Sequence, residues 1–245
     1  MAVSLLRAVP RRVREVYAIL GCRPGRLGRR VLLTATKIAT ARAIRFLDKA
    51  ERRGETFYGY YGGVAVSVVQ TGMGCPATAV TLEALCRAGV RLVVRSDLAG
   101  GIRREVRVGD LIVADRAFIG DGTARRYVGR MVVDGSSDVT ARLLSVARAR
   151  GWRVHAGPVW TTDVFFREEE DLRMAVETGC IGIDMETSAL FAVCSFYGVK
   201  CGAVMAVSDK PTEGKDFFDC IGRRVVEGLD HAVEVALETL SSFSL

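Results

Sequence analysis

Two short acidic segments carry the side chains best suited to chemistry on a small molecule. Asp184-Met185-Glu186 places a carboxylate on each side of a methionine, and Asp209 follows Ser208 further along the chain. A carboxylate can accept hydrogen bonds from two vicinal hydroxyls, and an acid with a raised pKa can protonate a leaving group. Each acid also has a structural interpretation, because Glu186 could lie at a helix start and Asp209 could be an N-cap or turn residue.

Arg95 is a candidate of another kind, a charge that ends the apolar segment Leu92-Val93-Val94. A buried charge without a partner is costly, so Arg95 needs one. A guanidinium is well suited to an anion such as phosphate. An internal salt bridge to Asp97 or Asp110 is the alternative, and the sequence leaves both interpretations open.

Two loops offer further ligand contacts. Gly72-Met73-Gly74-Cys75-Pro76 would let the backbone approach a ligand closely, although an ordinary tight turn explains the same glycines. Thr162-Asp163-Val164-Phe165 follows another predicted strand. Phe165 could stack on a base, and packing in the core is an equally good explanation.

The elements that must position these residues alternate between short β-branched strands and longer amphipathic helices. We expect strands over residues 31–34, 64–70, 90–95, 110–115, 154–161, 181–184 and 201–208. We expect helices over residues 38–49, 76–88, 139–150, 168–177, 187–196 and 216–240. This alternation predicts an α/β fold with a largely buried sheet. Ligands bind such sheets beyond the carboxyl ends of the strands, which selects the loops after Gln70, Arg95, Thr161, Ile183 and Val207.

Composition bounds the class of protein. The 245 residues are 49% hydrophobic, which is enough for one buried core, and no apolar run reaches the roughly 18 residues of a membrane span. No signal peptide is evident, so we expect a soluble cytoplasmic protein. The seven cysteines form no C-x-x-C pair and there are only two histidines, so we expect no metal site.

The N-terminal residues 1–30 differ from the rest in charge. They contain eight arginines against one acid, Glu15, in a chain of net charge +7. Such a segment could hold nucleic acid, but few aromatic residues are interleaved and no binding motif is present. We therefore expect a basic N-terminal arm over 1–30 that is solvated or contacts another subunit, and a single domain over 31–245.

In their order and spacing, four motifs resemble the nucleoside phosphorylase family, which includes purine nucleoside phosphorylases, uridine phosphorylases and methylthioadenosine nucleosidases. The resemblance covers residues 31–240, and its motifs lie at 71–74, 100–110, 182–187 and 206–209. It implies a three-layer α/β/α subunit with a mixed, partly barrel-like central sheet. It also implies a homo-oligomer, usually a hexamer built from dimers, whose active sites a neighbouring subunit completes.

The resemblance further implies a reaction and a set of roles. Family members cleave the N-glycosidic bond of a nucleoside with phosphate, giving free base and ribose 1-phosphate without a cofactor. An oxocarbenium-like ribose needs negative charge nearby, and a departing purine needs a proton. By this resemblance, Asp209 donates the proton, and Met73, Met185 and Glu186 contact the ribose. Phe165, Ala99, Gly100 and Asp184 contact the base. Arg95, Arg52 and Lys37 bind phosphate, and Arg52 does so in a neighbouring subunit.

The sequence also bears on which base is bound. Uridine phosphorylases use a Gln-x-Arg pair where this chain has Glu169 and Asp171, and they tend to lack an aspartate at the position of Asp209. Both features favour a purine, whereas Asp121-Gly122-Thr123 resembles the uridine branch. We expect a purine nucleoside.

The phosphate half of the resemblance is incomplete. The family's Gly-Asp-x-x-Arg loop is replaced by residues 34–38, where Lys37 could supply only a point charge. The small hydroxyl residue after the phosphate arginine is replaced by Asp97-Leu98. These changes keep two alternatives open, a nucleosidase that uses water and a nucleoside-binding protein without turnover. The segment Asp121-Gly122-Thr123 keeps a third alternative open, a uridine phosphorylase. A 5′-phosphorylated substrate is also conceivable.

Overall fold

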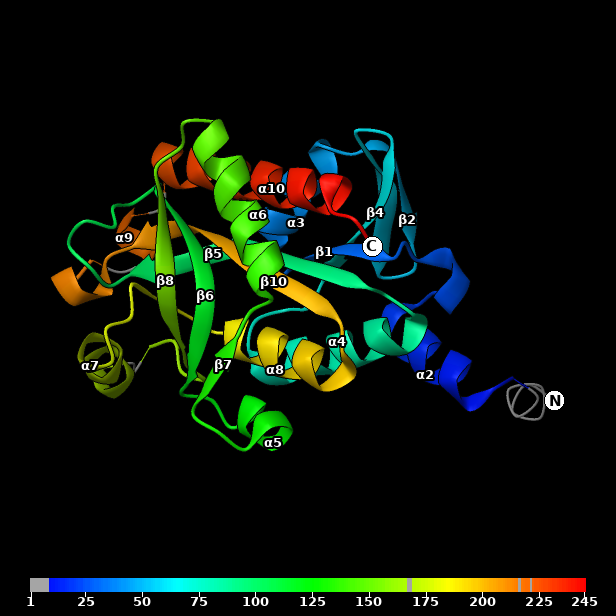
Figure 1. Ribbon diagram of the computed structural model, residues 1–245, viewed down its shortest axis with the longest axis horizontal. Helices are drawn as coiled ribbons and strands as arrows, with labels where there is room; N and C mark the ends of the chain where they lie inside the picture. Colours follow the sequence, from blue (N-terminus) through cyan, green and yellow to red (C-terminus); the bar gives the residue numbers. More distant parts are fainter. Residues whose placement is uncertain (1–8, 167–168, 216, 221) are drawn as a thin grey trace.

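A ten-stranded mixed sheet organises the described residues of the computed structural model, which are 9–166, 169–215, 217–220 and 222–245 (Figure 1). Its order is β10-β6-β8-β9-β5-β1-β4-β3-β2, with β7 paired to β6. The strands are β1 (Arg30–Thr34), β2 (Asp48–Arg53), β3 (Thr56–Tyr61), β4 (Val64–Gln70), β5 (Leu92–Gly101), β6 (Leu111–Ile119), β7 (Val132–Asp134), β8 (Val154–Thr161), β9 (Gly182–Asp184) and β10 (Lys200–Asp209).

Half of the sheet closes on itself. Strand β10 pairs antiparallel with β6 and parallel with β5, so β10, β6, β8, β9 and β5 form a continuous ring. The remaining path of β1, β4, β3 and β2 extends from β5 as an open sheet. This arrangement is the mixed, partly barrel-like sheet that the resemblance implied.

Helices cover both faces of the sheet and complete the three layers. The helices are α2 (Arg11–Leu20), α3 (Lys37–Arg45), α4 (Cys75–Ala88), α5 (Ala124–Val128), α6 (Ser137–Ala149), α7 (Glu169–Glu177), α8 (Thr187–Tyr197), α9 (Phe217–Cys220) and α10 (Arg223–Ser242), with short 3-10 turns η1 (Pro24–Arg26) and η2 (Pro211–Glu213). Helices α3, α6 and α10 share one hydrophobic core with the strands, and α2, α4 and α8 share another (Figure 1). Helix α8 is buried from Thr187 through Cys194, as its apolar sequence requires.

Strand β5 is the element that most directly positions the candidate residues. It pairs with β1, β10 and β9, and every residue except Leu98 is buried. It runs through Arg95 to Gly101, so the expectation of a strand that ends at Arg95 with a loop over 99–101 was wrong. Arg95 and Asp97 interrupt the apolar pattern of this strand and are buried through contacts with distant segments, so apolar periodicity alone did not reveal its length.

Two other boundaries differ from the sequence expectations. The helix expected over 38–49 ends at Arg45, and the charged residues of β2 then pair with β3 in an exposed hairpin. A highly charged edge strand lacks the apolar alternation that identifies strands. The helix expected over 216–240 is divided into α9 and α10, with Gly222 immediately before α10.

The N-terminal residues contribute to the folded unit. Helix α2 packs beside α4, and its Val16 and Leu20 are buried in the same core as α8. The αL residue Gly21 ends α2, and Glu55 donates a backbone hydrogen bond to the carbonyl of Leu20. In the described residues, no helix has the length and apolarity needed to cross a membrane.

Candidate active site

A cavity of about 440 Å³ lies where the ends of β5, β9 and β10 meet the loops after β1, β4 and β8. Most of the residues predicted for ligand binding line it, although they come from segments far apart in the chain. The predicted residues in its wall are Met73, Arg95, Ala99, Gly100, Phe165, Asp184, Met185, Glu186 and Asp209.

Asp184 and Glu186 have separate tasks at the junction of β9 and α8. Asp184 accepts hydrogen bonds from the amide of Thr187 at 3.0 Å and from the hydroxyl of Thr161 at 2.8 Å, so it fixes the start of α8. Glu186 occupies the N-cap position but its side chain makes no capping bond. Its Oε1 accepts from the amide of Gly74 at 2.8 Å. Capping therefore explains Asp184 and does not explain Glu186.

Arg95 balances both carboxylates. Its guanidinium lies 3.0 Å from Asp184 and forms a closer ion pair with Glu186, and all three side chains are almost fully buried. The internal salt bridge considered for Arg95 thus exists, with Asp184 and Glu186 as partners in place of Asp97 or Asp110. A role for Arg95 toward phosphate stays a prediction.

Burial sets the protonation behaviour of this group. It raises the pKa of Glu186 to about 7, although the neighbouring Arg95 lowers it. Burial alone would lower the pKa of Arg95, but the carboxylates of Glu186, Asp184 and Asp97 raise it above its ordinary value. The guanidinium therefore stays charged, and Glu186 is the acid here that can change charge near neutral pH.

One part of the cavity wall is aromatic. Phe165 is 42% exposed, so core packing does not explain it. Its ring lies edge-on to Phe166, with centroids 4.9 Å apart, and to Phe218 of α9 at 6.5 Å. Phe166 and Phe218 also line the cavity. Sequence reasoning did not select either, since Phe218 was assigned to the interior of one long helix.

Asp209 is the last residue of β10, and it lines the cavity. The hydroxyl of Ser208 donates to its carboxylate. The 3-10 turn that follows begins at Pro211 and has Lys210 as its N-cap, so Asp209 does not cap it. The side chain is therefore placed at the end of a strand, as its proposed role requires.

The two acids that replace the uridine-type pair are not equivalent. Glu169 lines the cavity. Asp171 accepts hydrogen bonds from the indole of Trp160 at 2.7 Å and from the hydroxyl of Thr162 at 2.8 Å, which holds α7 against the end of β8. Glu169 is thus the acid available to a ligand.

Two predicted phosphate residues lie outside this cavity wall. Lys37 is exposed in the first turn of α3. Arg52 is exposed on β2, where it donates to the carbonyl of Gly54 and pairs with Glu55. Arg52 is not part of the cavity wall of its own chain, and its role in a neighbouring subunit stays a prediction.

The part of the cavity wall beside the loop after β1 contains Asp97, which is 1% exposed. Its carboxylate accepts hydrogen bonds from the amides of Ala35 and Thr36 at 2.7 and 3.0 Å. The hydroxyl of Thr36 and the amide of Leu98 donate to it at 2.8 and 3.0 Å. The loop after β1 therefore closes around a carboxylate of its own chain.

These features agree with comparisons against known proteins. A family model described as the phosphorylase superfamily matches residues 20–243. The chain belongs to the phosphorylase superfamily. This confirms the family that the sequence motifs suggested, and it accounts for almost every element from the end of α2 to α10.

Characterised members of the superfamily are similar along most of their length. A uridine phosphorylase from Thermococcus kodakarensis is 31% identical over 77% of this chain and 75% of its own. A guanosine phosphorylase from Halorubrum lacusprofundi is 26% identical over 74% and 78%. A purine nucleoside phosphorylase from Clostridium novyi is 31% identical over 65% and 71%. These relatives are pentosyltransferases, so the expectation of an enzyme of this class is confirmed.

Solved structures of the superfamily confirm the fold. A uridine phosphorylase from Vibrio fischeri ES114, complexed with 6-hydroxy-1-naphthoic acid, has a TM-score of 0.80 and 25% identity over 89% of this chain and 93% of that one. A purine nucleoside phosphorylase from Toxoplasma gondii in complex with immucillin-H has a TM-score of 0.80 and 22% identity over 89% and 92%, which is evidence of fold alone.

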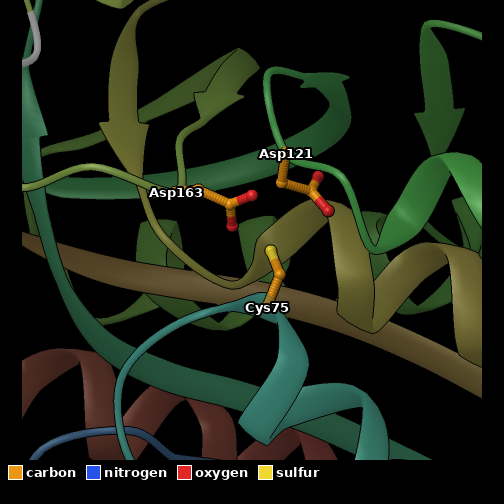
Figure 2. A group of neighbouring side chains, drawn as sticks. All are labelled: Cys75, Asp121 and Asp163. Carbon is orange, nitrogen blue, oxygen red and sulfur yellow. The ribbon is translucent and has the colours of Figure 1, made fainter.

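One group beside the cavity has side chains of metal-ligating type. Figure 2 shows Cys75, Asp121 and Asp163 pointing toward one another, and their ligand atoms lie within 4.8 Å. Asp121 accepts from the amide of Ala124 and the hydroxyl of Ser188. Asp163 accepts from the amide of Gly122 at 3.0 Å, and the thiol of Cys75 donates to the carbonyl of Met185 at 3.2 Å.

These hydrogen bonds give the group a structural task, because they hold the loops after β6 and β8 against the starts of α4 and α8. Burial raises the pKa of the Cys75 thiol, which keeps it protonated in this arrangement. The thiol also joins the group to the carbonyl of Met185, a residue of the cavity wall.

Proposed function

We propose that this protein cleaves the N-glycosidic bond of a purine nucleoside and transfers the ribosyl group to phosphate, which gives free base and ribose 1-phosphate. The observation that carries the proposal is one cavity whose wall contains Glu186, Met185, Phe165 and Asp209. Family membership supports the same reaction, since the relatives include purine, guanosine and uridine phosphorylases.

The sugar would lie against Glu186 and the two methionines. Glu186 has one carboxylate oxygen on the amide of Gly74 and the other toward Arg95, so its position is fixed before a ligand arrives. An ionised Glu186 can accept hydrogen bonds from ribose hydroxyls and stabilise the oxocarbenium-like state. Met73 is 67% exposed and can close over the apolar face of the ribose.

The base would stack in the aromatic part of the cavity. Phe165, Phe166 and Phe218 offer ring faces and edges for a flat heterocycle. As the bond between the anomeric carbon and the base nitrogen breaks, its electron pair passes to the base. Asp209 would donate a proton to the imidazole edge of the purine, while a phosphate oxygen forms the new bond to the anomeric carbon.

The choice of a purine rests on the acids around the base. Glu169 lines the cavity where uridine phosphorylases use an amide, and Asp171 is bound to Trp160 and Thr162. Neither can reproduce an amide and guanidinium pair on a uracil. Asp209 supplies the proton that a leaving purine needs.

The proposal includes several features carried over from the family. The protein is expected to act in the cytoplasm as a homo-oligomer, a hexamer built from dimers, in which Arg52 serves a neighbour's phosphate site. Phosphate is a co-substrate and no cofactor is needed.

Hydrolysis by water is the second candidate function, and the position of Asp97 favours it. A carboxylate already occupies the donors nearest the phosphate side of the cavity. A water molecule needs no such donors to reach the anomeric carbon.

A panel assay tests these functions. The protein is incubated with inosine, guanosine, adenosine and uridine, with and without phosphate, and free base, ribose and ribose 1-phosphate are measured. Purine release that depends on phosphate supports the proposal. Equal release without phosphate shows hydrolysis, preferential uridine cleavage contradicts the purine assignment, and binding without cleavage shows a nucleoside-binding protein.

Asp209→Asn tests the proton donor. We expect purine turnover to fall by about 100-fold or more, the usual contribution of a general acid, while nucleoside affinity stays within a few-fold. Asp134→Asn is the matched control, because Asp134 is an exposed aspartate at the end of β7 and lies outside the cavity wall. Unchanged turnover in Asp209→Asn would remove Asp209 from the mechanism.

A further inference from the structure

The carboxylate of Asp97 is bound in the manner of a ligand anion. Its Oδ2 accepts the amides of Ala35 and Thr36, and its Oδ1 accepts the hydroxyl of Thr36 and the amide of Leu98. Three of these donors lie 61 or 62 residues away in sequence, at the junction of β1 and α3. In the described part of the chain, Asp97 forms no ion pair within 4.0 Å.

These donors form an arrangement that any small oxyanion could use. Consecutive backbone amides at the end of a strand and the start of a helix make an anion-binding concavity, and the helix dipole adds to it. A hydroxyl and a fourth donor from β5 complete the shell around the carboxylate. We call the donors of Ala35, Thr36 and Leu98 the anion cradle.

Arg95 provides an independent sign that the cavity beside this cradle was shaped for an anion. Its Nε is buried and has no hydrogen-bond partner, although the two terminal nitrogens reach Asp184 and Glu186. Buried donors are rarely left unpaired. Arg95 and Asp97 are two residues apart on β5, so their side chains point to the same face, and both line the cavity.

We propose that Asp97 is an internal anion that competes with inorganic phosphate for the anion cradle and so determines how strongly this protein binds phosphate. The inference rests on the proposed function in taking phosphate as the co-substrate. Phosphate cannot accept hydrogen bonds from the cradle while the carboxylate holds them, and two anions so close repel each other. A neutral, smaller residue at position 97 would leave the donors free for phosphate.

The expected effect follows from the hydrogen bonds that phosphate would gain. Hydrogen bonds to charged groups each contribute enough to change an affinity about tenfold, and removal of the competing charge adds to this. We therefore expect Asp97→Ser to bind phosphate at least about tenfold more tightly than the wild type. We expect Asp97→Asn, which loses the charge but keeps the shape, to show a smaller gain.

Calorimetric titration with inorganic phosphate, in the absence of nucleoside, tests the proposal on the full-length protein. Asp110→Asn is the matched control, because Asp110 is also a buried carboxylate that accepts a backbone amide, at 3.0 Å from Arg107, but it lies outside the cavity wall. Its phosphate affinity should equal that of the wild type. An affinity of Asp97→Ser equal to or weaker than the wild type overturns the proposal.

The wild type alone gives a second measurement if the position 97 variants do not fold. Competition by Asp97 predicts that phosphate binds the wild type with a Kd weaker than about 1 mM, the upper end of ordinary substrate constants. A tighter Kd contradicts the proposal. Because these readouts need no turnover, absence of nucleoside cleavage would count against the proposed function and leave the competition by Asp97 to be decided by phosphate binding.

Discussion

Arg95→Met tests whether the guanidinium of Arg95 stabilises the folded protein by balancing the two buried carboxylates. Met has a long apolar side chain that can fill the same space. The substitution leaves Asp184 and Glu186 buried at 0% and 5% side-chain exposure without their cation. Removing one partner of a buried ion pair typically costs about 3–5 kcal/mol, out of a total of about 5–15 kcal/mol for a folded protein. We expect a loss in the upper half of that range, because two carboxylates lose the same partner.

The free energy of unfolding is measured by urea denaturation at fixed protein concentration, with thermal unfolding beside it. For a chain of this length each 1 kcal/mol lowers Tm by about 2–4 °C, so a loss of about 4–5 kcal/mol in Arg95→Met should lower Tm by roughly 8–20 °C. The loss should be larger at pH 8 than at pH 5. Burial already raises the pKa of Glu186 to about 7, and without the charge of Arg95 it rises further in the folded protein, so stability falls as pH rises from the ordinary value of 4.5 toward that raised value.

A double variant separates charge from packing. Arg95→Met with Glu186→Gln removes one of the unpaired carboxylates, so it should be more stable than Arg95→Met alone, with a coupling of at least about 1 kcal/mol. Additive losses in the double variant, or a loss below about 1 kcal/mol in Arg95→Met, would refute the view that Arg95 is held by these two carboxylates.

Two further predictions concern the pH response and the N-terminal packing. Burial raises the pKa of Glu186 from 4.5 to about 7, so the ionised form gains in population as pH rises. Nucleoside affinity should therefore increase between about pH 6 and 8, while the contribution of this group to stability declines. Glu186→Gln should bind nucleoside weakly and with no pH dependence, and an unchanged pH dependence in that variant would show that another group titrates. Gly54 has φ +66°, and a Cβ added there would lie 2.4 Å from the carbonyl carbon of Gly21, whereas at Gly62, with φ +55°, no atom lies within 4 Å of an added Cβ. In urea denaturation, Gly54→Ala should therefore lose about 2 kcal/mol more of the free energy of unfolding than Gly62→Ala. Equal losses would show that α2 does not pack tightly there.

The sequence was sufficient to predict the elements whose pattern is local. Strands β4 and β8 have the predicted bounds, because each is a β-branched segment between turn residues. The rule that ligand sites lie beyond strand ends then brought together segments around Met73, Phe165, Glu186 and Asp209, which do share one cavity. Their roles toward substrate stay predictions.

Other features depend on contacts that the local sequence does not encode. Arg95 meets Asp184 because β9 pairs with the far end of β5, a neighbour relation set by the whole sheet. Phe218 reaches Phe165 because the predicted C-terminal helix is divided before α10. Three of the four donors to Asp97 lie 61 or 62 residues away, so its sequence neighbours could not reveal how its carboxylate is held.

The charges on β5 explain why the two halves of this site can be tested separately. On the proposed sugar side, the guanidinium of Arg95 holds two carboxylates, and changes there are predicted to alter both stability and nucleoside binding. On the phosphate side, Asp97 is held by neutral donors alone, so its removal takes away negative charge without leaving a buried cation unpaired. A phosphate that enters this region meets three buried carboxylates and one guanidinium already shared between two of them. Loss of the carboxylate at position 97 should therefore strengthen phosphate binding more than the cation at position 37 does, because Lys37 is exposed and solvent screens its charge.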